Sequence, residues 1–152
     1  MSEITETCEP AKVRARPLIV DVYAYLEGED VLFSQAWKRE GDAKRSKGRI
    51  DIPHGQQDTP IHFHLHDRTG LRLSFMSPAA DAMWVALDDC PTCKGDAGQI
   101  VHDSVSQNQL KVTDLNAGEA CTLHYALRFD GDATVEGPPY EYDPEIRNGG
   151  SS

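Results

Sequence analysis

The sequence predicts an all-β fold, an antiparallel β-sandwich of about seven strands, on three observations. Short stretches alternate apolar and polar residues with the period of two that a half-buried strand requires. Turn-forming glycine, proline, aspartate and asparagine residues recur between these stretches. No window of the sequence carries the apolar stripe of an amphipathic helix. Together these patterns are typical of two packed sheets of short strands.

The first strands follow a polar start to the chain. Residues 1–16 are polar and without periodicity, which predicts a flexible N-terminal arm. From Leu18 to Leu26 every second residue is apolar, so one face of an extended chain is suited to burial. The turn at residues 28–30 then leads into a second, less regular strand from Val31 to Ala36.

The same alternation predicts five further strands. The first two are joined by the turn at residues 68–70, and the last two by residues 114–118, which form the clearest hairpin signal in the chain. The five strands cover residues 61–65, 71–75, 83–87, 110–112 and 121–129.

Length and composition favour a single domain. The chain has 152 residues, of which 39% are hydrophobic and 26% charged, as in ordinary globular domains. A second core of sufficient size would not fit in this length. We therefore assign residues 17–152 to one sandwich domain, whose last part, residues 131–152, is an extended tail rich in proline, glycine and acidic residues.

The charge balance argues against two classes of partner. Acidic residues number 25 and basic residues 15, and the formal net charge of -10 repels nucleic-acid phosphates and anionic lipid surfaces. The sequence has no apolar run long enough to cross a bilayer and no apolar signal-peptide core near its start. We therefore expect a cytoplasmic protein, whose four cysteines are thiols or metal ligands.

The first candidate site is a row of three histidines, His62, His64 and His66. They alternate with apolar residues, so on a strand all three point away from the core. Two histidines separated by one residue can chelate a transition metal, because their attachment points lie ~6.6 Å apart. His62 and His66 are ~13 Å apart, so a further ligand from another strand is required, and His124 is the candidate. The alternative is that the row decorates a solvated sheet face or a dimer contact.

A second candidate site is the turn that contains Cys90 and Cys93. Thiolates at this spacing can hold one zinc ion, although they supply only half of the usual four ligands. The alternatives are a redox pair and a plain proline-containing turn.

A basic segment is a further feature of the sequence. Residues 38–49 carry six Lys and Arg side chains. They indicate either a site that binds an anion or an acidic partner, or a solvated loop.

The tail supplies the candidate interaction residues. Proline fixes an extended course for the chain, and the tyrosines and the isoleucine offer apolar anchors. We expect the tail to lie across the sandwich and to cover a sheet edge, in the same molecule or in a neighbour. The interaction residues are Tyr140, Tyr142, Asp143, Pro144 and Ile146.

Two stretches of the C-terminal part carry a resemblance to a known family. Residues 142–148, Tyr-Asp-Pro-Glu-Ile-Arg-Asn, and residues 112–116, Val-Thr-Asp-Leu-Asn, resemble the DP-EP family of functionally uncharacterised bacterial proteins. The resemblance extends from residue 112 to the C-terminus. It implies an immunoglobulin-like or cupredoxin-like sandwich in a bacterial protein, and it brings no catalytic residue with it.

No complete catalytic motif is present in the sequence, so whether the protein is an enzyme stays open. The favoured interpretation is a non-enzymatic β-sandwich module that binds another protein or copies of itself. The alternative is a transition-metal-binding protein, or a metalloenzyme, that holds zinc or another transition metal with the histidines or with the Cys-x-x-Cys turn. No other cofactor is indicated.

Overall fold

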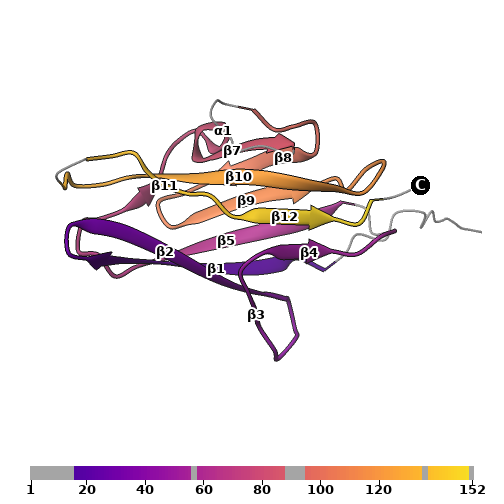
Figure 1. The fold of residues 1–152 in the computed structure, drawn as a ribbon, viewed down its shortest axis with the longest axis horizontal. Coiled ribbons are helices and arrows are strands. Elements are labelled where there is room, and N and C mark those ends of the chain that lie inside the picture. The colour runs from indigo at the N-terminus through magenta and orange to yellow at the C-terminus, as the bar shows by residue number, and fades with distance from the viewer. Residues whose placement is uncertain (1–15, 56–57, 88–94, 135–136, 151–152) are drawn as a thin grey trace, which may run out of the picture.

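The computed structural model describes residues 16–55, 58–87, 95–134 and 137–150, and within them twelve strands form two facing sheets (Figure 1). The predicted all-β sandwich is confirmed. A single helical turn, α1 (Ala79–Ala82), is the exception in these residues. The strand number exceeds the prediction because several strands have only two to four residues, which is too short for a visible alternation.

The first sheet has six strands in the order β3-β2-β1-β5-β9-β8. At its centre β1 and β5 run parallel, with Leu18 opposite Ile61, while the other neighbours are antiparallel. The strands are β1 (Leu18–Glu27), β2 (Asp30–Arg39), β3 (Ser46–Lys47), β5 (Thr59–Asp67), β8 (Ile100–Val105) and β9 (Gln109–Asp114).

The second sheet is built around one long strand, β10, which pairs with β6 and β7 and also with β11 and β12. The parallel pair of β12 and β4 continues it. Its strands are β4 (Ile50–Ile52), β6 (Ser74–Phe75), β7 (Met83–Leu87), β10 (Cys121–Asp130), β11 (Tyr140–Tyr142) and β12 (Glu145–Asn148).

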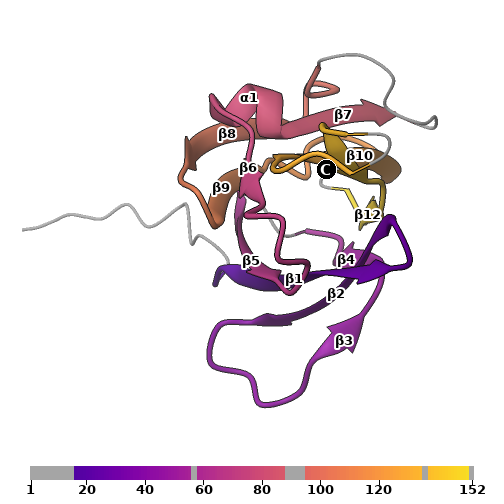
Figure 2. The same ribbon diagram turned by 90° about the vertical axis from the view of Figure 1, so that its left-hand side faces the viewer.

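Both sheets are mixed, whereas the sequence predicts antiparallel pairing throughout. The difference arises because the chain leaves the first sheet after β3, adds β4 to the second sheet, and returns as β5 beside β1. Such a crossover brings β5 back in the same direction as β1. The end-on view in Figure 2 shows the two layers, with β7 and β10 in one and β1 and β2 in the other.

The core lies between the sheets and follows the predicted alternation. Every second residue of β1 from Leu18 to Ala24 is fully buried, and so are Ile61 and Phe63 on β5. Tyr125 on β10 is the largest fully buried side chain in the described chain. A polar contact also joins the two sheets at one side of the sandwich: Nε2 of His102 on β8 lies 2.9 Å from the carbonyl oxygen of Met83 on β7.

The C-terminal tail is an integral part of the second sheet. Its strands β11 and β12 both pair with β10, and β12 lies between β10 and β4 (Figure 1). Ile146 on β12 is fully buried. The predicted arm at residues 1–16 lies outside the described residues except for Arg16. No helix in the described ranges is long and apolar enough to span a bilayer.

Candidate binding face

The histidine row lies on β5, on the outer face of the first sheet. Ile61 and Phe63 point into the core and are fully buried, so the three histidines point the other way, as predicted. His62 and His64 are half-buried, and His66 is exposed. Their neighbours on this face come from β1 and β9: Ile19 and Lys111 flank His62, Asp21 and Gln109 flank His64, and Tyr23 lies beside His66.

The carboxylate of Asp21 has two charged or ionisable partners on this face, His66 and Arg45. Its Oδ1 lies 2.8 Å from Nε2 of His66, and its Oδ2 lies 3.2 Å from Nη1 of Arg45. The Asp21 residue is only 8% exposed, so both partners approach it from the solvent side. The carboxylate therefore orients an imidazole and a guanidinium at the surface.

Tyr23 extends this arrangement. Its ring stacks on the imidazole of His66 with centroids 4.9 Å apart, and its hydroxyl accepts a 3.1 Å hydrogen bond from Arg45. The guanidinium carbon of Arg68 lies 5.1 Å from the centre of the same ring. Two arginines and one histidine are thus gathered around one tyrosine, an arrangement suited to binding carboxylates or phosphates.

His62 has a different environment. Partial burial, together with the positive charge of Lys111 and of His64, lowers the pKa of His62 below its ordinary value. The carboxylates of Glu40 and Asp103 act in the opposite direction but more weakly. His62 therefore takes up a proton at a lower pH than an ordinary histidine does.

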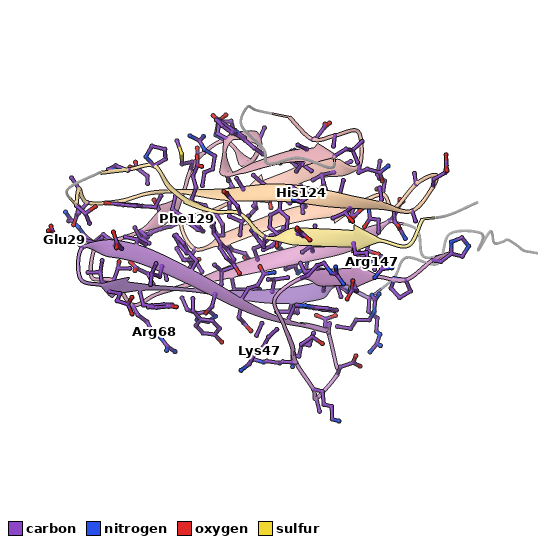
Figure 3. The ribbon with its side chains drawn as sticks, in the orientation of Figure 1. Glu29, Lys47, Arg68, His124, Phe129 and Arg147 are labelled. Atoms are coloured by element: carbon purple, nitrogen blue, oxygen red, sulfur yellow. The ribbon has the colours of Figure 1, made fainter. Side chains whose placement is uncertain are left out.

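Cationic side chains dominate this outer face, which we call the cationic face. In Figure 3 Arg68 and Lys47 project from the side of β1 and β2 that faces away from β10. Within the described ranges no carboxylate forms an ion pair with Lys38, Lys47 or Lys111, which lie on the same face by strand register. The cationic face comprises Lys38, Arg45, Lys47, Arg68 and Lys111 with His62, His64 and His66.

His124 does not join the histidine row. It lies on β10 in the second sheet and also points outward, because its neighbours Leu123 and Tyr125 are fully buried. Its Nδ1 lies 3.5 Å from Oε2 of Glu145. The hydrophobic core separates the two outer faces, so His124 cannot be the further ligand that a metal site on β5 requires.

No group of three or more His, Cys, Asp or Glu side chains is placed to hold a metal ion, as far as the described parts of the chain extend. Cys90 and Cys93, the other predicted ligands, lie outside the described residues.

The predicted interaction residues of the tail mostly make contacts within the molecule. The Tyr140 hydroxyl donates a 2.6 Å hydrogen bond to the carbonyl oxygen of Asp132, and the Tyr142 ring stacks on Phe33 at 5.6 Å. The carbonyl oxygen of Pro144 accepts a 3.1 Å hydrogen bond from the backbone of Tyr125. Ile146 is fully buried, whereas Asp143 is exposed.

Burial also changes the acidity of two tail residues. It raises the pKa of Tyr142 to about 12, with a smaller contribution from Tyr25. Partial desolvation of its carboxyl group likewise raises the pKa of Asp143, although the residue is largely exposed, and the nearby charge of Glu141 adds to this effect. Both groups therefore hold their protons more strongly in the folded chain than in an unfolded one.

A buried polar cluster at one end of the sandwich is absent from the sequence-based predictions. Nδ2 of Asn148 on β12 donates a 2.9 Å hydrogen bond to Oδ1 of Asp114 at the end of β9. The backbone N–H of Asn116 donates a second, 2.8 Å bond to the same oxygen. One feature of the sequence could have predicted this cluster. Asp114 follows Leu110 and Val112 at a spacing of two residues, so a polar side chain takes a position on the buried, apolar face of the strand.

No protein-family model matches the chain, and no curated protein matches its sequence. The fold defines the chain as a β-sandwich protein, and one outer face of its first sheet is rich in Lys, Arg and His side chains.

Proposed function

We propose that this protein is a non-enzymatic β-sandwich module that binds an acidic protein segment on the cationic face. The observation that carries the proposal is the concentration of lysine, arginine and histidine side chains on one outer sheet face of a chain whose formal net charge is -10. Such a local reversal of charge steers an acidic partner to one face and repels it from the remaining surface.

The Tyr23 surroundings supply the chemistry of recognition. Arginine binds carboxylates with two parallel hydrogen bonds, and tyrosine and arginine are enriched among the residues that contribute most to protein interfaces. Arg45 is held in place by Asp21 and Tyr23, and Arg68 by the Tyr23 ring. Holding these side chains in advance reduces the entropy lost when a partner binds.

Other parts of the molecule are weaker candidates for the binding surface. The tail is used within the second sheet, so it is a poor candidate for a free binding segment. The edge strands β3 and β4 have two and three residues, and β8 carries an irregularity between His102 and Ser104. Short and irregular edges discourage pairing with another chain. A sheet face is therefore a better candidate than the edges at β3, β4 and β8.

The proposal is tested with a fluorescently labelled glutamate-rich peptide and the full chain in a low-salt buffer, followed by anisotropy. We expect Lys47→Glu and Arg68→Glu each to weaken binding about tenfold, as expected for loss of a close charge pair. Arg147→Glu is the matched control, because Arg147 is exposed on the outer face of the second sheet (Figure 3).

Three outcomes would refute this function. They are the absence of peptide binding, equal losses in the control and the two face variants, and tighter binding of a single-stranded oligonucleotide of the same charge. The last outcome would replace the acidic protein segment by a nucleic acid.

We also propose that the chain is a bacterial, cytoplasmic member of the DP-EP family. In support, the two stretches that carry the resemblance meet in the fold through the hydrogen bond between Asn148 and Asp114. An alignment of DP-EP sequences in which these two positions change together would strengthen the proposal, and independent variation of the two would count against it.

A further inference from the structure

Three buried polar residues meet between the sheets at the end of the sandwich. Thr59 on β5 is the direct cross-strand partner of Asp114 on β9, and both point into the interior. Asn148 reaches them from β12 of the second sheet through its 2.9 Å hydrogen bond to Asp114. Thr59 and Asp114 are 0% exposed and Asn148 is 1% exposed.

Each of these residues carries an oxygen without a hydrogen-bond partner among the described residues: Oγ1 of Thr59, Oδ2 of Asp114 and Oδ1 of Asn148. Leaving a buried oxygen unpaired costs about 1–3 kcal/mol, and more for a charged group. Three such oxygens from neighbouring residues therefore indicate that a further positive or hydrogen-bonding group belongs between them.

The charge of Asp114 is also uncompensated. Its Oδ1 accepts hydrogen bonds from Asn148 and Asn116, which are both neutral donors, and no described Lys, Arg or His forms an ion pair with it. A buried carboxylate without a countercharge is strongly unfavourable.

We propose that Thr59, Asp114 and Asn148 bind one monovalent alkali-metal cation between the sheets. Carboxylate, amide and hydroxyl oxygens are hard donors, which suit alkali and alkaline-earth ions rather than zinc or copper. A single carboxylate balances one positive charge, whereas a divalent ion in the same place would leave a buried positive charge.

The surroundings hold the oxygens in place. Nδ2 of Asn116 donates to the carbonyl oxygen of Pro53 at 3.1 Å, and Oδ1 of Asn116 accepts from the backbone of Gly150 at 2.9 Å. The backbone of Gly149 donates to Ile52 at 2.8 Å. The end of the tail is thereby fastened to the chain after β4, so an ion bound here would join the tail to the first sheet.

The test is thermal unfolding of the full chain at mildly alkaline pH in sodium, potassium or tetramethylammonium chloride of equal ionic strength. Tetramethylammonium is too large to enter the cluster. We expect a Tm about 5 °C higher in sodium or potassium chloride, because a ligand that binds only the folded state stabilises it. The salt with the larger effect identifies the preferred ion.

Variants connect the effect to the cluster. Thr59→Val keeps the size and the strand preference of the side chain but removes the oxygen, and we expect it to abolish the difference between salts. Asp114→Asn should do the same. Thr113→Val is the matched control and should keep the difference, because the Thr113 hydroxyl bonds Asp103, at 2.7 Å, outside the cluster.

Equal Tm values in the three salts would overturn the proposal, and so would a salt difference that persists in Thr59→Val and Asp114→Asn. A response to calcium chloride without one to sodium or potassium would overturn the monovalent assignment. Crystals soaked in a rubidium salt provide the direct check, with anomalous scattering expected between Thr59, Asp114 and Asn148.

Discussion

The hydroxyl of Tyr125 on β10 donates a 3.0 Å hydrogen bond to Oε1 of Gln35 on β2, and this bond joins the two sheets inside the core. Nε2 of Gln35 in turn donates a 2.7 Å bond to the carbonyl oxygen of Gly48. The glutamine thus connects the second sheet to the β2–β3 hairpin, which carries Lys47 and Arg45 of the cationic face. Burial raises the pKa of Tyr125 well above its ordinary value, which keeps the hydroxyl protonated.

Removing this hydroxyl is expected to destabilise the protein. In Tyr125→Phe, Oε1 of Gln35 stays buried without a donor, and the free energy of unfolding should fall by about 1–3 kcal/mol. Urea denaturation measures the loss. Tyr25→Phe is the control, because Tyr25 is 39% exposed and its substitution should have little effect. If both variants lost the same stability, the inter-sheet bond would make no net contribution.

Alkaline pH should destabilise the fold through its tyrosines. The pKa of Tyr142 is raised to about 12 from 10.0, and that of Tyr125 is also raised well above its ordinary value. The folded chain therefore keeps protons that the unfolded chain releases, so this contribution is complete below pH 10 and is lost as the pH rises through 12. Urea midpoints measured on either side of pH 10 should show the decline, and Tyr142→Phe should reduce its steepness. A midpoint independent of pH would contradict this account.

Ile146 should contribute to stability although it lies close to the end of the chain. It is fully buried and lies opposite Leu123 and Ile50 in the second sheet. Ile146→Ala should lower the free energy of unfolding by about 2–5 kcal/mol, the usual cost of such a cavity. The adjacent Arg147 is exposed, so Arg147→Ala serves as the control and should change stability by less than about 0.5 kcal/mol.

Truncation of the chain after Asp132 should destabilise the fold more than Ile146→Ala does. It removes β11 and β12, exposes the backbone of β10 on one side and leaves Ile50 without its partner. We expect the shortened chain not to fold cooperatively, as circular dichroism during heating would show. A truncated chain with an unchanged Tm would mean that the tail is dispensable.

Binding of the glutamate-rich peptide should strengthen in mild acid. The pKa of His62 lies below its ordinary value, so His62 gains its positive charge only as the pH falls, and this charge adds to that of the cationic face. The glutamates of the peptide stay ionised down to about pH 5. Anisotropy titrations down to this pH should show rising affinity, and His62→Gln should reduce the rise. An affinity that falls in acid would exclude His62 from the interface.

The alternation of the sequence was sufficient to assign the faces of the long strands. Every second residue from Leu18 to Ala24 is buried, as the spacing predicts, because a strand directs neighbouring side chains to opposite sides. The same holds for Ile61, Phe63 and Leu123. The short strands β3, β4, β11 and β12 escaped prediction because two to four residues carry no measurable period, and the predicted strand at residues 71–75 is reduced to the two residues of β6. Strand β8 was missed as well, since only Ile100 among its residues is buried.

The alternation of apolar and polar residues is enough to assign the buried side of each long strand, and with it the outward direction of His62, His64 and His66. Which strands are neighbours becomes known only from the folded structure. It placed His124 across the core from the row, paired β1 with β5 in parallel, and brought Asn148 to Asp114 over a separation of 34 residues. The reason is physical: periodicity is a local property of a few consecutive residues, whereas the pairing of strands depends on packing and hydrogen bonds between distant segments.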